Sequence, residues 1–338
     1  MERLLASMAT GGQQFSGASS IERMLWPFVR LVIGISVVAT AATSLAPYHW
    51  LAELLANLRI QQCLGLIALL CICIACRRWV SLAIICACLA LHLPWFASAF
   101  PAKNAIATNA EPLTITLANV LTSNERHDAI IADVLSQSPD FFVILELSFS
   151  LANALANRTG SSYPHSIVRP QDVSNFGIGV YSRHPIDESR VLTFGSEIES
   201  IGAKIRSPGG SCRVFATHPI PPIGAFQAQW RNDHLEQLAA TIQEVKSKDS
   251  KTPIVLVGDL NLTPWSPYFE KLETSSGLHR ASNRFNVTPT WYRYPSFPFG
   301  LVLDHALISD ELKCVGHVVG QDIGSDHRSV SVKLVPVD

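Results

Sequence analysis

The sequence lacks several features that would assign a function at once. No G-x-G-x-x-G or P-loop pattern follows any β-branched run, so a fold that cradles nucleotide phosphates has no support. No internal repeat is visible, which leaves repeat architectures without support. Beyond residue 100 cysteine is limited to Cys212 and Cys314, and two cysteines are too few for a disulfide framework.

An excess of positive charge is also missing from the larger part of the chain. Residues 1–100 carry 6 Lys and Arg against 3 Asp and Glu, whereas residues 101–338 carry 20 against 24. The net charges of the two parts are therefore +3 and −4, consistent with −1 for the whole chain. Tight nonspecific binding to nucleic acid normally requires a basic face, so the acidic balance of residues 101–338 argues against it.

Long apolar runs are abundant, but only before residue 101. Three of them reach the roughly 17–25 residues that cross a bilayer, namely residues 24–46, 60–76 and 79–100. Arg77 and Arg78 separate the second run from the third, which predicts a tight helical hairpin. A cleaved signal peptide would explain at most the first run, so we expect three transmembrane helices.

The positions of the basic residues predict the orientation of these helices. Arg3 and Arg23 precede the first run, and Arg77 and Arg78 lie between the second and third. Cytoplasmic loops are enriched in Lys and Arg, so both groups are expected inside and the carboxyl-terminal part outside. Within the expected loop 47–59, only Arg59 opposes this assignment.

After residue 111 the pattern changes to short β-branched runs separated by turns and a few helices. Expected strands cover residues 114–120, 141–147, 177–181, 211–217, 254–258 and 304–308. Ser123 is expected to cap a helix after the first strand, and a longer helix is expected over about 227–246. The predicted organisation is a disordered segment 1–20, a membrane anchor 21–100, a linker 101–111 and an α/β domain 112–338.

Polar residues stand at the ends of these expected strands. They are Asn119, Glu146, His218, Asp259, Asn261, Asp304, His305, Asp326 and His327. Each alone fits a turn, a helix cap or a satisfied core histidine. Together they gather charge at one edge of a sheet, where repulsion requires a cation or ion pairing. Oxygen donors without cysteine suit Mg²⁺ or Mn²⁺, with Ca²⁺ as a further option, and the histidines can exchange protons with a phosphate ester and its attacking water.

The order and spacing of these motifs resemble the endonuclease/exonuclease/phosphatase superfamily, with its deoxyribonuclease-I-like fold. The segments GDLN, LDHALIS and SDHRSV carry the resemblance, which covers about residues 112–336. The apolar amino terminus, with NFGIGVYSRHPI, THPIPP and PTW, resembles a bacterial membrane-anchored branch that includes the YafD-like proteins. The resemblance implies an α/β (α+β) fold, a four-layer α/β sandwich of two packed mixed β-sheets flanked by helices, here preceded by three transmembrane helices.

The resemblance also implies a role for each site residue. The implied metal-site residues are Asn119, Glu146 and Asp326, with Glu146 as the direct ligand. The implied catalytic residues are His218, Asp259, Asn261, Asp304 and His327. In the family's scheme His218 donates to the scissile phosphate, Asp259 orients or deprotonates the attacking water, Asn261 binds phosphate beside it, and Asp304 pairs with His327. Whether Asp259 or His327 is the base stays open at this point.

Three further positions complete the family's pattern, and two depart from it. Asn175 and Arg183 match positions near the catalytic face and are candidates for substrate binding, whereas His305 is expected to be structural. Leu145 stands before Glu146, where relatives often have Gln, and Ala118-Asn119-Val120 lacks the second Asn of several nucleases. No match is visible for the basic loops with which nucleases hold DNA, so the departures weaken a nuclease function more than a hydrolase function.

The function implied is a membrane-anchored, divalent-metal-dependent phosphoesterase that hydrolyses a phosphodiester or phosphomonoester by attack of metal-assisted water. Its location would be the bacterial inner (cell) membrane, with the catalytic domain facing the periplasm or exterior. The substrate would be a phospholipid, a lipid-linked phosphate or nucleic acid, and no protein partner is implied. The alternatives are an extracytoplasmic nuclease and a non-catalytic binding or sensor module on the same fold.

An aromatic segment before Asp304 has two interpretations. It contains Trp291, Tyr292, Tyr294, Phe297 and Phe299. These side chains either pack in the core and form turns, or make a lip that contacts acyl chains or bases.

Overall fold

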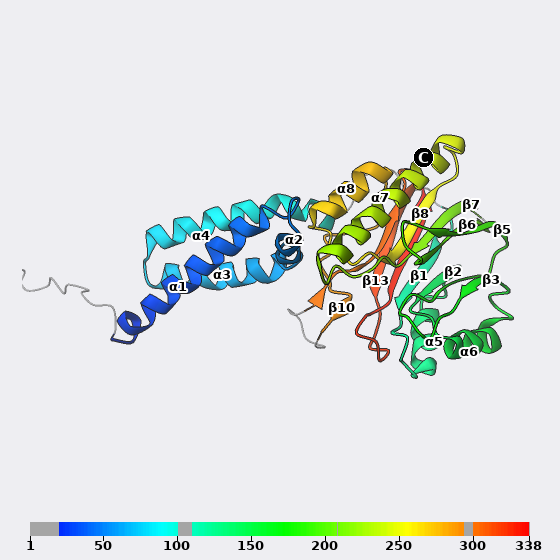
Figure 1. Ribbon diagram of the computed structural model, residues 1–338, viewed down its shortest axis with the longest axis horizontal. Helices are drawn as coiled ribbons and strands as arrows, with labels where there is room; N and C mark the ends of the chain where they lie inside the picture. Colours follow the sequence, from blue (N-terminus) through cyan, green and yellow to red (C-terminus); the bar gives the residue numbers. More distant parts are fainter. Residues whose placement is uncertain (1–19, 101–109, 208, 294–299, 338) are drawn as a thin grey trace, which may run out of the picture. The chain divides into compact units, whose positions relative to one another are not determined.

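The computed structural model describes residues 20–100, 110–207, 209–293 and 300–337 (Figure 1). The chain divides into two compact units: one comprises the described part of residues 1–41 with residues 62–91, and the other comprises residues 42–61 with residues 92–338. The predicted disordered segment 1–20 and linker 101–111 fall almost entirely outside the described residues.

The first unit is a bundle of apolar helices. It contains most of α1 (Ser20–Thr43), α3 (Arg59–Ala75) and α4 (Trp79–His92). The 3-10 helix η1 (Leu93–Ala99), which follows α4 directly, belongs to the second unit. Met24–Thr43 and Trp79–Ala99 are each long and apolar enough to cross a membrane, and α3 qualifies only together with the short helix before it. Two or three helices could therefore span a membrane, where the sequence predicts three.

The expected loop 47–59 contains a helix, α2 (Trp50–Asn57). The His49 side chain caps it by accepting a hydrogen bond from the Leu51 backbone N–H at 3.2 Å. Two of the side chains that α2 buries, Glu53 and Asn57, are polar. A pattern that looks for an apolar buried face therefore fails to detect this helix.

The second unit contains two six-stranded mixed sheets. The first has the order β13 (Leu312–Val319), β14 (Val330–Pro336), β1 (Leu113–Asn119), β2 (Phe141–Leu145), β4 (Ile178–Ser182), β3 (His165–Arg169). The second has the order β5 (Ile186–Thr193), β6 (Glu199–Ser207), β7 (Gly210–Thr217), β8 (Ile254–Asp259), β12 (Asp304–Ile308), β9 (His279–Arg280). Only β1–β2 and β7–β8 pair in parallel within these sheets. A small pair, β10 (Trp291–Tyr292) and β11 (Gly300–Leu301), lies apart from both.

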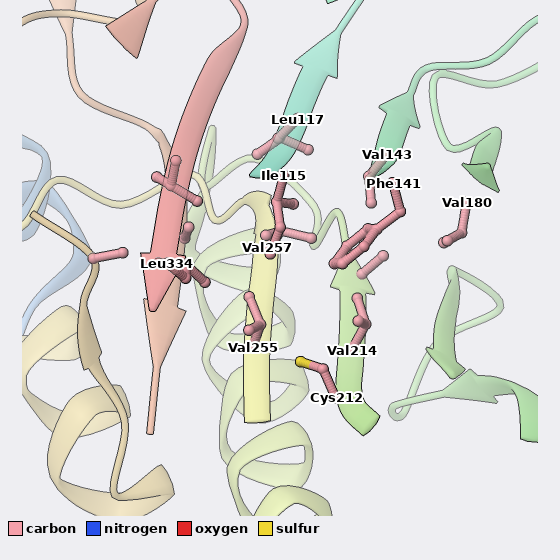
Figure 2. Close-up of a cluster of buried hydrophobic side chains, with 14 of the residues drawn as sticks. Ile115, Leu117, Phe141, Val143, Val180, Cys212, Val214, Val255, Val257 and Leu334 are labelled. Carbon is pink, nitrogen blue, oxygen red and sulfur yellow. The ribbon is translucent and has the colours of Figure 1, made fainter. Parts of the chain in front are cut away.

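Helices cover the outer faces of the two sheets. The inner faces meet in one apolar layer, in which Val255 and Val257 of β8 approach Ile115 and Leu117 of β1 (Figure 2). Helices α5 (His127–Leu135) and α6 (Phe149–Thr159) pack on the first sheet, and α7 (Ala225–Lys248) and α8 (Pro267–Ser276) pack on the second (Figure 1). The structure thus confirms two packed mixed β-sheets flanked by helices.

Strand β2 shows why such runs form inner strands. Phe141, Val143 and Leu145 face the layer between the sheets, whereas Phe142 and Ile144 face α5 and α6. A strand that is buried on both faces is apolar throughout, so it reads as a continuous run instead of an alternating one.

The helix after β1 begins later than the sequence suggests. Ser123 is not its cap, because α5 begins at His127. The Asn124 side chain accepts a hydrogen bond from the Arg126 backbone N–H and donates to the Val120 and Ile323 carbonyl oxygens. These bonds hold residues 120–126 in a turn, and the helix can start only after it.

Candidate active site

Strand pairing brings the candidate residues to one edge of the sandwich. Asn119 ends β1 opposite Leu145, and Glu146 directly follows β2. His218 directly follows β7, and Asp259 ends β8 opposite Asp304, the first residue of the antiparallel strand β12. Carboxyl ends of parallel strands share one edge, and an antiparallel neighbour begins at that edge, so topology alone gathers these side chains.

The Asn119 carboxamide joins the two sheets at this edge. Its Nδ2 lies 2.9 Å from Oε1 of Glu146 and 3.2 Å from Oδ2 of Asp259. The Thr122 backbone N–H donates to the other Glu146 oxygen at 3.3 Å. One amide group therefore holds two carboxylates close together.

Two histidines approach the same oxygen of Asp259. His218 Nε2 and His327 Nε2 each lie 3.5 Å from Asp259 Oδ2. Behind His327, its Nδ1 bonds to Oδ2 of the buried Asp304 at 2.8 Å. Three nitrogen atoms, with that of Asn119, thus converge on one carboxylate oxygen.

Charge coupling within the cluster shifts the pKa values of its members. Burial disfavours the imidazolium of His327, yet the carboxylates of Asp304 and Asp259 raise its pKa to about 10. Burial also opposes charge on His218, but Asp259 and Glu146 raise its pKa. Conversely, although burial opposes ionisation of Asp259, the charge of His327 and the hydrogen bond from His218 lower its pKa. The carboxylate of Asp259 thus lies between two imidazoles whose charged forms it favours, and its own ionised form is favoured by them in turn.

The backbone is strained at two positions of the site. Glu146 has φ of 57° and Asn261 has φ of 51°, in the left-handed region that non-glycine residues seldom adopt. At Asn261 the N–H donates to Asp259 Oδ1 at 3.0 Å, and the side chain donates to the Pro219 carbonyl oxygen at 3.0 Å. Such strain persists only where surrounding bonds enforce it, and it clusters at functional sites.

The PTW segment supports the two Asp-His motifs. Thr290 Oγ1 accepts hydrogen bonds from the backbone N–H groups of Leu303 and Asp304, each at 3.0 Å. The Trp291 indole N–H donates to Oδ2 of the exposed Asp326 at 2.8 Å. The sequence identified this segment only as part of the family's pattern, so the contacts add two supporting residues.

A cavity of about 930 Å³ opens onto this cluster. Of the predicted site residues, those that line it are Glu146, Asn175, His218, Asp259, Asn261, Asp326 and His327. Asn119 and Asp304 are buried behind these residues. Arg183 is not in the lining; its guanidinium lies over the Tyr163 ring, beside a different hollow, so a role for it in substrate binding stays a prediction.

His305 is part of the core, as its expected structural role requires. Its Nε2 lies 2.8 Å from the Leu262 carbonyl oxygen, and burial lowers its pKa to about 3. Asp259, Asp304 and His327 form the one group of three metal-ligand side chains within the described residues. However, Asp304 is buried and already paired with His327, so this group resembles a hydrogen-bonded relay more than a cation cage.

A hard cation fits better beside Glu146. This carboxylate is 8% exposed, lines the cavity, and forms no ion pair with a Lys or Arg among the described residues. A buried carboxylate without a cationic partner is costly, and oxygen donors suit Mg²⁺ or Mn²⁺. The donor set is therefore compatible with the predicted divalent ion.

Part of the cavity lining comes from α2, which the sequence did not associate with the site. Leu54, Asn57 and Leu58 line the cavity together with the candidate site residues. Residues 42–61 belong to the same compact unit as the sandwich, although residues 62–91 separate them from it in the sequence. The site is thus assembled from two distant parts of the chain.

A buried ion pair attaches α2 to the β8–α8 loop, residues 260–266, which follows Asp259. Glu53 and Arg231, both 0% exposed, are joined by a contact of 2.6 Å between Oε2 and Nη2. Arg231 Nη1 donates to the Asn261 carbonyl oxygen at 3.0 Å, and Ser266 donates to the other oxygen of Glu53 at 3.2 Å. One turn later, Asn57 Oδ1 accepts from the backbone N–H and the hydroxyl of Thr263.

The last residue of α2 and the first residue of α3 continue this attachment. The Trp265 indole donates to the Asn57 carbonyl oxygen, and Arg59 Nε donates to the Trp265 carbonyl oxygen. The guanidinium of Arg59 also lies 4.5 Å from the Trp95 ring centre. The sequence did contain a signal for the pairing of α2 with α7. Glu53 is the single acidic residue of an apolar stretch, and Arg231 falls on the apolar face of α7 with Leu235 and Leu238.

Comparison with known proteins agrees with this geometry. The profile of the Endonuclease/Exonuclease/phosphatase family matches residues 116–327. No curated protein matches the chain.

Several solved structures are similar in fold. Sphingomyelinase C from Streptomyces griseocarneus is 17% identical, with 66% of this chain and 99% of that chain covered and a TM-score of 0.52. TDP2 from D. rerio complexed with single strand DNA product is 17% identical, with 67% and 99% covered and a TM-score of 0.55. A beta toxin mutant from Staphylococcus aureus with bound magnesium ions is 15% identical, with 67% and 100% covered and a TM-score of 0.50.

At these identities the solved structures show a shared fold, whereas the family profile covers well over half of the chain. The protein belongs to the endonuclease/exonuclease/phosphatase family.

Proposed function

We propose that this protein is a membrane-anchored, divalent-metal-dependent phosphoesterase that hydrolyses a phosphodiester or a phosphomonoester. The observation that carries the proposal is the convergence of Asn119, His218 and His327 on one oxygen of Asp259, beside Glu146. Members of the family are mostly metal-dependent hydrolases that act on phosphoesters. The non-catalytic alternative predicts that some of these groups are missing, and each of them is present.

Asn119, Glu146 and Asp326 would hold the divalent ion. When bound, Mg²⁺ or Mn²⁺ (or Ca²⁺) would supply positive charge that polarises the phosphoryl group and offsets charge developing on its oxygens. The magnesium ions of the beta toxin structure support this choice. Asn119 orients Glu146 toward the cavity by its 2.9 Å contact.

The pKa shifts within the cluster support a role for each remaining residue. Asp259, whose pKa is lowered, is a carboxylate at neutral pH and can orient the attacking water and take its proton. His327, whose pKa is raised to about 10, stays protonated and would donate to a phosphate oxygen, as would His218. We therefore propose Asp259 as the base. Asn261 and the exposed Asn175 would bind the phosphate from the cavity wall.

The membrane location is part of the same proposal. The segment 42–61 and the catalytic sandwich belong to one compact unit, so an even number of membrane crossings must lie between them. We assign two crossings, one to α4 and one to α3 without α2; the 17 residues of α3 lie at the lower limit of a bilayer-spanning helix. Arg59 packs against Trp95 and Trp265, so it no longer opposes an outside position for this unit. We therefore place the catalytic domain outside a bacterial cell membrane, as in the YafD-like branch.

Substrates of two kinds are represented among the structural neighbours. Sphingomyelinase C is named for a phospholipid, and TDP2 was solved with a DNA product. A phospholipid, a lipid-linked phosphate and nucleic acid are all phosphate esters, so the extracytoplasmic nuclease is the second candidate function. The net charge of −4 over residues 101–338 disfavours it.

The test uses the full chain, purified in detergent, because the sandwich alone would leave Arg231 without Glu53. Bis-p-nitrophenyl phosphate should be hydrolysed only with Mg²⁺ or Mn²⁺. The activity should be lost with excess chelator and restored by added metal. Asp259→Ala should abolish the activity while the circular dichroism spectrum stays unchanged. Hydrolysis that persists in Asp259→Ala or in excess chelator contradicts the proposal.

A further inference from the structure

The two faces of α2 make different contacts with the same site. Glu53 and Asn57, four residues apart, point into the protein and bind Arg231 and Thr263. Leu54 and Leu58, also four residues apart, line the cavity. Residues at this spacing lie on one side of a helix, so α2 presents a polar anchoring face and an apolar face toward the substrate.

Two further aliphatic side chains line the same cavity. Ile220 and Ile223, which follow His218, line the cavity with Leu54 and Leu58. Ile223 is 77% exposed and Leu58 is 40% exposed. Water contact with so much apolar surface at the mouth of a site is unfavourable, and an apolar ligand that covers it gains free energy.

These observations define where the two ends of a substrate would lie. The phosphate belongs at the polar cluster of His218, Asp259 and His327. The rest of the described lining offers several aliphatic groups and one cationic side chain, that of Arg293. Leu58 is also followed directly by Arg59, the first residue of the apolar helix α3. The apolar side of the cavity is therefore bonded to one of the helices that could enter a membrane.

We propose that α2 is the specificity-determining element of this site, and that Leu54 and Leu58 bind an aliphatic chain esterified to the scissile phosphate. The proposal rests on the phosphoesterase function and deepens it. The substrate class is an amphiphilic phosphoester. The polar face of α2 holds the two chain-binding leucines in a fixed position relative to the β8–α8 loop. No covalent step is added to the reaction.

The experiment compares esters that differ only in one group. Full-length protein at a fixed detergent concentration is assayed with Mg²⁺ on p-nitrophenyl methyl phosphate, p-nitrophenyl octyl phosphate below its micelle concentration, and thymidine 5′-p-nitrophenyl phosphate. Since a buried methylene contributes roughly fourfold, the octyl ester should exceed the methyl ester in kcat/KM by at least about tenfold. The thymidine ester should resemble the methyl ester.

Single-residue variants then test which side chains produce the preference for the octyl ester. Leu54→Gln and Leu58→Gln should each lower the octyl-to-methyl ratio about fivefold to tenfold, mainly through KM. Leu51→Gln is the matched control, because Leu51 lies on α2, is 51% exposed and is not among the lining residues. It should keep the wild-type ratio. Calorimetric measurement of the affinities for octyl phosphate and for methyl phosphate gives the same comparison without turnover.

Each outcome decides the matter. An octyl-to-methyl ratio near one in the wild type, a ratio unchanged by both leucine variants, or a preference for the thymidine ester overturns the inference while leaving the phosphoesterase intact. If no ester is hydrolysed but octyl phosphate binds and Leu58→Gln weakens it, the chain site stands and the proposed function fails.

Discussion

The cavity has two walls of different origin. The polar wall, formed by Glu146, His218, Asp259, Asn261 and His327, lies within residues 116–327, which the family profile matches. The α2 wall, formed by Leu54, Asn57 and Leu58, lies outside them, in a short helix between two apolar helices. Charged residues fill the first wall, and aliphatic groups dominate the second.

In our proposal the polar wall carries out the reaction and the α2 wall selects the substrate. The polar wall contains the residues to which our proposal assigns phosphoester hydrolysis, and these say little about which ester is used. The α2 wall lies outside the segment that the family profile matches, and in our proposal it contacts the part of the substrate that does not react. Interactions of that kind choose between substrates, whereas the polar wall sets the rate for all of them.

The largest effect should come from the polar wall. Asp259→Asn removes the carboxylate that orients water and should lower kcat by about 10²–10⁴-fold for the methyl and octyl esters alike. Steady-state rates on both esters measure this, with Leu51→Gln as the unaffected control. If the loss differs between the two esters, the walls do not act separately.

The next largest effect should come from the ion pair between Glu53 and Arg231, which connects the two walls. Glu53→Gln leaves Arg231 buried without its ionic partner and should cost about 3–5 kcal/mol of stability. Thermal unfolding of the full chain followed by circular dichroism measures the loss. The double variant Glu53→Gln with Arg231→Met removes both charges and should regain most of it; equal stability of Glu53→Gln and wild type would show that α2 is not held by this pair.

Acid should destabilise the protein through a buried histidine beside the polar wall. Burial lowers the pKa of His234 to about 4, and its Nε2 lies 2.7 Å from the hydroxyl of Thr217, next to His218. The unfolded chain binds this proton near pH 6.5 and the folded chain only near pH 4, so stability falls as the pH drops between these values. The contribution of His234 is about 3 kcal/mol.

Unfolding of His234→Asn measured from pH 7 to pH 4 checks this. The variant should lose less stability over that range than the wild type, even if its stability at pH 7 is lower. Parallel pH dependences of the two proteins would contradict the assignment.

The smallest effect should come from the support of the polar wall. Trp291→Phe removes the hydrogen bond to Asp326 and should raise the Mg²⁺ concentration for half-maximal activity about fivefold, or about 1 kcal/mol. The octyl-to-methyl ratio should not change. A shifted ratio with unaltered metal dependence would instead place Trp291 on the substrate side. The aromatic residues Tyr294, Phe297 and Phe299 lie outside the described residues.

The sequence was sufficient for the strands that are buried on both faces. The runs around Phe141 and Ile254 could be recognised because apolar residues fill every position. Strand β5, whose residues are mostly exposed, and helices α6 and α8 were not predicted, since their patterns are short and mixed. Strand ends were less certain; β2 stops at Leu145 because Glu146 adopts a left-handed conformation.

The sequence alone determined which residue types end the strands, and strand ends in a packed α/β sandwich must meet at an edge. It therefore identified Glu146, His218, Asp259 and His327 before any geometry was available. Only the tertiary structure showed that Glu53 pairs with Arg231, 178 residues away, and that Leu54 and Leu58 thereby enter the site. A local pattern records which face of a helix is apolar, but the partner of a buried charge is chosen by the packing of distant elements.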